Sequence, residues 1–414
     1  MTVDALMAEY GSPLWLVDLD RVRARLCEFR DVWTAAWPEV EVGYSYKTNR
    51  LPAILRVLAS EGAGHEVVCE AEYALARDAI GAAGPDVIVN GPVKSDALLE
   101  RAASDGALVV VDSEPELERA ARAGVERVGL RVALAGIGVE PTRFGIAPAL
   151  VPEAAARALA LGLHLEALSV HLVSTGFDQP LAGARRLGAA ITVQWPPPTA
   201  GHAAAAERLA RLAVSLGVPA IDLGGGFPAA PAVAAHAGAV ADALRANGFA
   251  GRLILEPGRA LVTDAVALAF SVVAVKRLDD GTRCVVVDAG TNLLPGTLWS
   301  WPRIEMIPTP GTRERPLTPA LVSGPLCLNV DVLHPAAPLP ELERGDTLLV
   351  RDAGAYQQAQ STRFGDLQPA VLAREDDRWR VCRRRETLDD LLACDIDVAL
   401  AGATAPAGSQ EGPT

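Results

Sequence analysis

The sequence predicts an α/β fold, a (β/α)8 TIM-type barrel followed by a C-terminal β-rich domain of the β-sandwich or barrel-like kind. Two observations carry this prediction. Up to about residue 265, eight short apolar runs alternate with Ala/Leu/Arg-rich stretches, and beyond it strand-like runs are separated by Pro/Gly-rich turns. Eight strands with helical crossovers are typical of a barrel. An open doubly wound sheet has a similar order of strands and helices along the chain, but the strand count favours the barrel.

The first part of the chain supplies the barrel elements. The expected strands are residues 42–46, 66–68, 87–90, 108–111, 128–132, 167–171, 220–223 and 253–256. Between them, stretches such as 71–80, 95–103 and 114–124 carry apolar residues at three- and four-residue spacing, which predicts helices. The Pro-rich segment 194–202 is expected to be a loop.

The β-rich domain is predicted from the change in sequence pattern after about residue 265. Residues 271–278, 283–290 and 346–354 read as strands bounded by turn residues, and the N-terminal piece 12–20 reads as a strand that joins them. The predicted division is an N-terminal strand segment at 1–30, the barrel at 31–265, the β domain at 266–400 and a disordered tail at 401–414.

Composition excludes several classes of partner. The 414 residues carry a formal net charge of −13, which argues against nucleic acid or an anionic membrane as a partner. No apolar run reaches the roughly 18 residues of a membrane span, and no secretory signal is visible. None of the six cysteines forms a C-x-x-C pair, which favours a reduced, cytoplasmic setting. No metal site is expected.

Functional residues of a barrel lie at the C-terminal ends of its strands. In this chain those ends carry Lys47, Cys69, Asn90, Arg131, His171, Gly224 and Glu256. A lysine at the barrel mouth can become a Schiff-base nucleophile if burial and nearby cations lower its pKa. The alternative for Lys47 is a solvated lysine that merely ends a strand.

The last strands end in groups that suit a phosphorylated ring. The Gly224–Gly226 turn follows the seventh strand, where backbone N–H groups can hold a phosphate, although a simple tight turn is the alternative. Glu256 could keep a pyridine nitrogen protonated and Arg259 could contact a phosphate, or the two could form an ion pair at a turn. His171 could stack on the ring and Ser174 could donate to the phosphate, but a structural histidine fits equally.

Together these segments resemble the fold-type III pyridoxal-phosphate (PLP) decarboxylases, which act on diaminopimelate, ornithine and arginine and are related to alanine racemase. The resemblance covers nearly the whole chain and rests on YSYKTN, GHEVVCEAE, VHLVS, LGGGFP, EPGR, GPLCLNVD and GAY, in this order. It implies a Schiff base between PLP and Lys47, with catalytic roles for His171 and Glu256. It assigns the remaining cofactor contacts to Ser174, Gly224, Gly225, Gly226, Gly258, Arg259 and Tyr356.

The resemblance also implies a homodimer with shared active sites. Cys327, in the Gly-Pro-x-Cys segment, would enter the partner's site and reprotonate Cα as a general acid. The departures from the family concern the substrate, because Leu328, Trp299 and Ser300 stand where the family places charged or tyrosine residues.

The sequence therefore predicts a PLP-dependent decarboxylase of a non-standard or modified amino acid. The alternatives are an amino-acid racemase or epimerase on the same scaffold, a non-catalytic regulatory relative, and a Schiff-base aldolase. The aldolase would not need the glycine turn and EPGR together.

Overall fold

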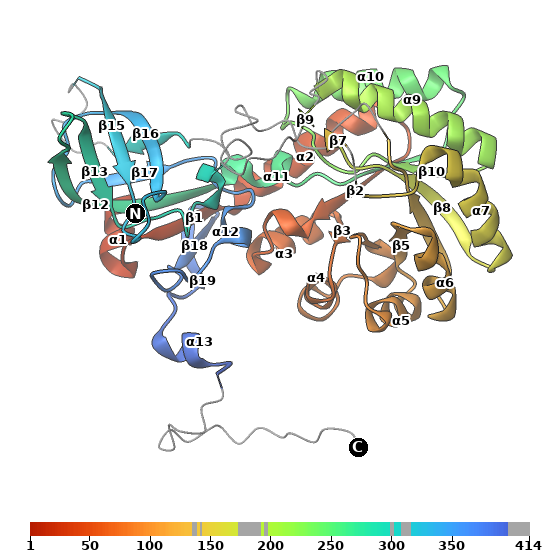
Figure 1. Ribbon diagram of the computed structural model, residues 1–414, viewed down its shortest axis with the longest axis horizontal. Coiled ribbons are helices and arrows are strands. Elements are labelled where there is room, and N and C mark those ends of the chain that lie inside the picture. Colours follow the sequence, from red (N-terminus) through yellow and green to blue (C-terminus); the bar gives the residue numbers. More distant parts are fainter. Residues whose placement is uncertain are drawn as a thin grey trace.

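The computed structural model describes residues 1–134, 139–140, 143–172, 192–193, 198–298, 302–307 and 316–395. Figure 1 shows two bodies side by side, with the barrel and its helices on the right and the β domain on the left. The predicted tail at 401–414 lies outside the described residues, and the predicted domain boundaries at residues 30, 265 and 400 stay predictions.

Eight parallel strands close the barrel, in the spatial order β10-β11-β2-β3-β4-β5-β6-β8. The pairing of Leu253 with Val40 joins the last strand to the first, which excludes the open sheet. Every strand overlaps one expected from the sequence, so the barrel prediction is confirmed. The strands are β2 (Val40–Ser45), β3 (Gly64–Val67), β4 (Val87–Val89), β5 (Leu108–Val111), β6 (Arg127–Arg131), β8 (His164–Ser169), β10 (Ala220–Asp222) and β11 (Arg252–Leu255).

Helices cover the outside of the barrel. They are α3 (Pro52–Ser60), α4 (Glu70–Ala74), α5 (Asp96–Asp105), α6 (Glu114–Arg122), α7 (Val151–Ala160), α9 (Pro198–Leu216), α10 (Val233–Ala246) and α11 (Arg259–Val262). Local chemistry sets their ends. At α5, the Ser95 hydroxyl accepts a hydrogen bond from the Leu98 N–H (3.1 Å), and the helix ends at Gly106 with φ +72°.

The expected loop at 194–202 is wrong in its second half, because α9 begins at Pro198. Proline is tolerated in the first turn of a helix, where its missing N–H would have no intrahelical partner. The Ala-rich residues that follow then propagate the helix. The Pro-rich composition therefore marks a helix start. A short two-stranded pair, β7 (Val139–Glu140) with β9 (Thr192–Val193), lies outside the barrel sheet.

The β domain is a mixed sheet in the order β16-β15-β13-β12-β1-β18-β19, with β17 also pairing with β12 and β14. As predicted, the N-terminal strand belongs to it: Leu14 pairs with Ala269 of β12 and Trp15 with Val371 of β18. The strands are β1 (Leu14–Asp18), β12 (Val266–Arg277), β13 (Arg283–Val287), β14 (Ile304–Met306), β15 (Thr318–Ser323), β16 (Val332–Leu339), β17 (Thr347–Val350), β18 (Val371–Glu375) and β19 (Arg378–Arg383).

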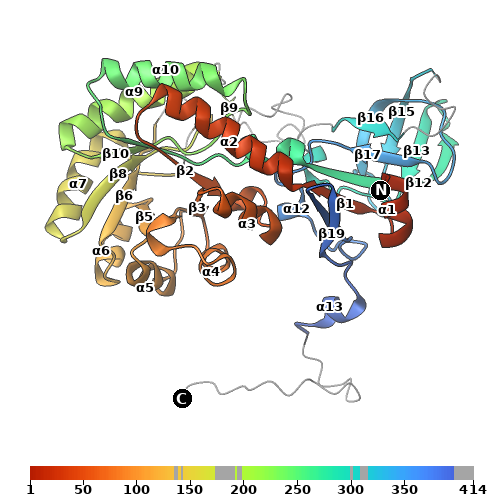
Figure 2. The ribbon, with the colours of Figure 1, turned by 180° about the vertical axis from the view of Figure 1, so that it is seen from behind.

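The helix α2 (Leu19–Ala36) connects the two bodies, as Figure 2 shows from behind. It leaves β1 in the β domain and lies along the barrel before the chain enters β2. Its buried residues Val22, Leu26, Phe29 and Trp33 recur every three or four positions, so a single face packs onto the barrel. Short helices complete the fold: α1 (Val3–Tyr10), α12 (Gln357–Gln360) and α13 (Leu388–Leu392). None of the described helices is long and apolar enough to span a membrane.

Candidate active site

Lys47 lies just beyond β2, in a single 3-10 turn (Tyr46–Thr48), with Nζ 2.8 Å from Oε2 of the fully buried Glu66. Burial lowers the pKa of Lys47, but the charges of Glu66 and Glu256 outweigh burial, so its pKa lies above the ordinary value. The surroundings therefore do not supply the lowered pKa that the nucleophilic role calls for. Lys47 becomes a good nucleophile only when another cation offsets these carboxylates.

Glu256 follows β11 and is 2% exposed. Burial raises its pKa well above the ordinary value, and the nearby Asp222 and Glu66 raise it further. The Asn90 amide joins the acids, because its Nδ2 donates to Glu256 Oε1 (2.5 Å) and to Glu66 Oε1 (3.2 Å). A buried carboxyl cluster of this kind favours a cationic partner, and a protonated pyridine nitrogen is such a partner.

The glycine turn follows β10, and its first two glycines have no room for side chains. A Cβ on Gly224 would lie 2.7 Å from His171 Nδ1, and one on Gly225 would lie 2.7 Å from the Glu256 carbonyl oxygen. Two N–H groups of the turn already have acceptors: Gly224 N–H donates to Asp222 Oδ1 (2.8 Å) and Gly225 N–H to His171 Nδ1 (3.2 Å). No described residue accepts from Gly226 N–H, so within the described part of the chain this group is open to a phosphate.

His171 follows β8 and touches the same turn. Burial lowers its pKa to about 3, helped by the charges of Lys47 and Arg131. The imidazole is therefore neutral at physiological pH, which suits a ring that stacks on a cofactor rather than one that carries charge.

The Glu-Pro-Gly-Arg turn closes onto the lysine turn. A Cβ on Gly258 would lie 2.0 Å from Thr48 Oγ1, so only glycine allows this contact. Arg259 stacks its guanidinium over the Tyr356 ring at 4.8 Å. An arginine guanidinium at the end of a barrel strand, stacked on a tyrosine ring, is a suitable place for a phosphate.

The β domain reaches this end of the barrel through Gly354 and Tyr356. The Tyr356 N–H donates to the Thr48 carbonyl (2.8 Å), and Asn49 Nδ2 donates to the Gly354 carbonyl (3.0 Å). Tyr356 has φ +63°, a left-handed conformation that is uncommon for a non-glycine residue. Both bodies therefore contribute to the site.

Cys327 and Leu328 lie on the 324–331 segment between β15 and β16, and both are exposed. The acid of this segment, Asp331, is buried and accepts from the N–H groups of Thr291 (2.7 Å) and Leu326 (2.8 Å). Asp331 therefore holds the segment together and does not face a ligand. Three predicted site residues, Ser174, Trp299 and Ser300, lie outside the described residues.

Sequence reasoning missed Asp222. It is fully buried, and besides Gly224 it accepts from the Ser169 hydroxyl (2.9 Å). Burial raises its pKa to about 6. The signal was present, since an aspartate inside the apolar strand 220–223 is an anomaly that calls for a partner.

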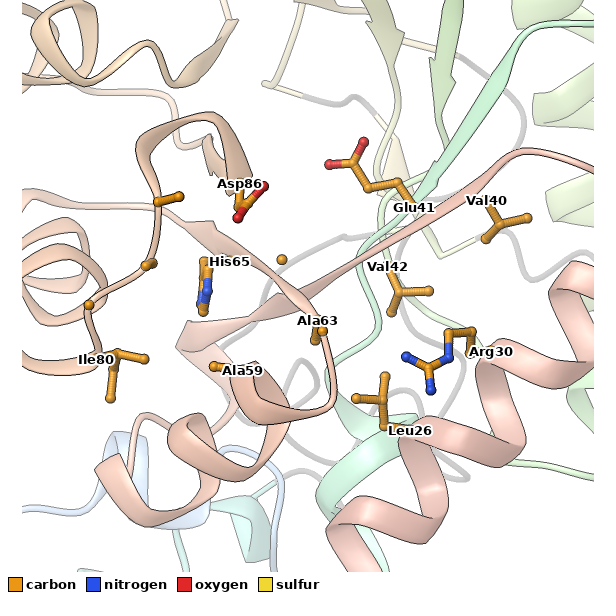
Figure 3. A pocket seen from close by; sticks show the side chains of 15 residues that line it. Leu26, Arg30, Val40, Glu41, Val42, Ala59, Ala63, His65, Ile80 and Asp86 are labelled. Carbon is orange, nitrogen blue, oxygen red and sulfur yellow. The ribbon is translucent and has the colours of Figure 1, made fainter.

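A cavity of about 420 Å³ lies elsewhere in the barrel (Figure 3). Its walls include Val40, Glu41, Gly64 and His65, which start β2 and β3. The beginnings of parallel strands lie at the opposite end of a barrel from the ends that carry Lys47 and Glu256. The cavity is therefore separate from the site described above.

The site's residues fit PLP on their own chemistry. An amine, a buried acid, a neutral imidazole, an open backbone N–H and an arginine gather at neighbouring strand ends. These are the groups needed for the aldehyde, the pyridine nitrogen, the ring face and the phosphate of this cofactor. Lys47 would hold the aldehyde, Glu256 the pyridine nitrogen and His171 the ring face. Gly226 and Arg259 would hold the phosphate.

Comparison with known proteins agrees. Residues 20–195 match the family described as pyridoxal-dependent decarboxylase, pyridoxal binding domain. The diaminopimelate decarboxylase of Deinococcus radiodurans is 31% identical over 94% of this chain and 96% of its own length. That of Actinosynnema pretiosum is 34% identical over 94% and 90%. The solved diaminopimelate decarboxylase of Helicobacter pylori, complexed with L-lysine, shares the fold with a TM-score of 0.81 at 24% identity, over 95% of this chain and 98% of that one.

Proposed function

The chain belongs to the pyridoxal-dependent decarboxylases, the family of the diaminopimelate decarboxylases, and on that premise we propose that it decarboxylates a non-standard or modified amino acid with its cofactor attached to Lys47. Family membership makes it a PLP-dependent carboxy-lyase. The observation that carries the residue assignment is the chain of contacts from Lys47 through Glu66 and Asn90 to Glu256.

Each residue then has a defined task. PLP, when bound, takes up the electron pair left on Cα as carbon dioxide leaves. Lys47 Nζ would hold the cofactor through its aldehyde carbon. Glu256 would hold a proton at the pyridine nitrogen, and His171 would lie against one face of the ring. Gly226 N–H and Arg259 would bind the phosphate.

Reprotonation of Cα is assigned to Cys327 of a second copy of the chain. The Cys327 thiol is exposed, and it lies on the segment that also carries the exposed apolar side chains Leu328 and Val330. An apolar surface beside an exposed thiol is what an interface with a second copy would cover. We therefore propose a homodimer in which each site takes Lys47 from one copy and Cys327 from the other.

Mixing a Lys47→Ala chain with a Cys327→Ala chain should restore activity. Each parent homodimer lacks one group at both sites, whereas a mixed dimer contains one site with both groups intact. Random exchange makes half the dimers mixed, and each has one complete site, so up to about a quarter of the wild-type rate is expected. Subunit exchange is verified by native mass spectrometry. If exchange is complete and the mixture stays inactive, the shared-site arrangement is wrong.

The substrate is expected to lack a terminal ammonium group. A desolvated ammonium without a carboxylate partner costs several kcal/mol, and the 324–331 segment offers only Leu328, because Asp331 is buried in backbone hydrogen bonds. Wild-type kcat/KM on ornithine, lysine and meso-diaminopimelate should stay below about 10⁴ M⁻¹s⁻¹. Norleucine and Nε-acetyl-lysine serve as neutral comparisons.

The matched variant is Leu328→Asp, which places a carboxylate where the wild type has none. It should raise kcat/KM on at least one diamino acid about tenfold, mainly through KM, and leave norleucine unimproved. The relatives named above favour diaminopimelate as the second candidate substrate. A wild-type value above about 10⁴ M⁻¹s⁻¹ on that compound would establish it and overturn the proposal.

Two measurements, carbon dioxide release and optical activity, distinguish decarboxylation from racemisation. A decarboxylase releases one carbon dioxide per substrate consumed, whereas a racemase removes optical activity and releases none. Loss of optical activity without carbon dioxide would favour the racemase alternative, and absence of turnover on a broad amino-acid panel would favour a regulatory relative. A cytoplasmic location stays a prediction.

A further inference from the structure

Two buried histidines lie behind the glycine turn, on the helices α9 and α10. His202 and His236 are 3% and 4% exposed, and neither stands at a strand end. His202 stacks on Phe227, which follows the turn, with ring centroids 4.1 Å apart. Burying two imidazoles between helices costs free energy unless their ring nitrogens form hydrogen bonds.

Their hydrogen bonds assign both tautomers. His202 Nε2 lies 3.2 Å from the Gly225 carbonyl oxygen, and its Nδ1 lies 3.2 Å from His236 Nδ1. A carbonyl oxygen can only accept, so His202 Nε2 must carry the hydrogen and donate. A neutral His202 has its one N–H on Nε2, so its Nδ1 accepts and His236 Nδ1 donates. Burial lowers the pKa of His236 to about 4, which agrees with a neutral ring.

The pair holds the peptide that carries the open N–H. In a trans peptide the C=O and N–H point in opposite directions across one plane. The hydrogen bond from His202 to the Gly225 carbonyl therefore aims the Gly226 N–H away from the histidines. On its other side, Gly225 N–H donates to His171 Nδ1, so a neutral His171 carries its hydrogen on Nε2.

We propose that His236 and His202 are positioning residues: they fix the Gly225–Gly226 peptide so that Gly226 N–H faces the cofactor phosphate, and through Gly225 they orient His171. The inference rests on the proposed assignment of the glycine turn to the phosphate. This His236–His202 pair, called the relay below, touches neither substrate nor cofactor. It acts only through the backbone of the glycine turn.

The test compares His236→Leu with His236→Asn. Leucine removes the donor that His236 Nδ1 supplies to His202 Nδ1, whereas the asparagine Nδ2 can replace it. Dissociation constants for PLP and for pyridoxal, which lacks the phosphate, are measured by reconstituting apoprotein. His236→Leu should weaken PLP binding about tenfold or more and leave pyridoxal binding within about twofold. His236→Asn should remain within about threefold of wild type for both.

Gly226→Ala separates failure of the relay from failure of the phosphate assignment. If the turn binds the phosphate, this variant weakens PLP more than pyridoxal, because Gly226 has φ +87° and the added Cβ strains it. A selective Gly226→Ala effect with none in His236→Leu overturns the relay alone. If neither variant discriminates PLP from pyridoxal, the phosphate assignment fails, and with it the role proposed for the relay.

A second measurement does not depend on binding or on either variant. The chain has six histidines, so ¹⁵N-histidine labelling of the wild-type holoenzyme gives an assignable set of ring nitrogens. His202 should be protonated on Nε2 and His236 on Nδ1. A wild-type His202 protonated on Nδ1 would overturn the relay.

Discussion

Replacing Lys47 by alanine is expected to abolish the absorbance of lysine-bound cofactor and to lower kcat by at least about 10³-fold. The chain contains three lysines, and the other two cannot substitute. Lys94 is 1% exposed, with Nζ bound to Glu116 and to the Gly91 carbonyl. Lys276 lies on β12 in the β domain. Of the three lysines, only Lys47 contacts the buried acids of the site, through Glu66 Oε2.

The matched control for Lys47→Ala is Lys276→Ala, which removes an exposed lysine and should leave the spectrum and kcat unchanged. Borohydride reduction of the wild-type holoenzyme followed by peptide mapping gives an independent measurement. The label should fall on the peptide that contains Lys47. A label on Lys94 or Lys276, or an unaltered spectrum in Lys47→Ala, would falsify the assignment.

Glu256→Gln is expected to keep the cofactor and to lose about 10² to 10³-fold in kcat, the loss that follows removal of one preorganised electrostatic group. An amide cannot hold a proton at the pyridine nitrogen. Glutamine does preserve the volume of the side chain and a partner for the Asn90 amide, whose Nδ2 donates to Glu256 Oε1. Packing is thereby conserved while the acid is lost.

The comparison variant for Glu256→Gln is Glu256→Asp, which keeps an acid one methylene short of its place and should retain more activity than glutamine does. Cofactor content after dialysis and steady-state kinetics are measured together for both variants. A fully loaded, folded Glu256→Gln protein with near-normal kcat would exclude the proposed role, and glutamine outperforming aspartate would point to packing instead of charge.

The strand and helix pattern of the barrel was predictable because it is local. Alternating apolar runs and amphipathic stretches lead to eight strands, and each overlaps a strand of the closed barrel. The one clear error, the loop expected at 194–202, arose because proline at Pro198 can start a helix as well as interrupt one.

The groups that could carry chemistry were also readable from the sequence, since the chain direction alone puts Lys47, His171, Gly224 and Glu256 at strand ends. What only the tertiary structure decided is how these groups are paired. Asn90 and Glu256 are 166 positions apart and still share a hydrogen bond, because β4 and β11 belong to one closed ring of strands.

The same holds for the turn that faces the phosphate. The sequence places three glycines, Gly224–Gly226, directly after the apolar run 220–223, which indicates a turn that carries no side chains. Which of its N–H groups stays open depends on Asp222, on His171 and on two histidines from outer helices, and no local pattern places them there. Local spacing fixes where a chain turns and which residues stand at its strand ends. Closure of the barrel fixes which distant side chains meet, because hydrogen bonds depend on positions in space that residue spacing does not encode.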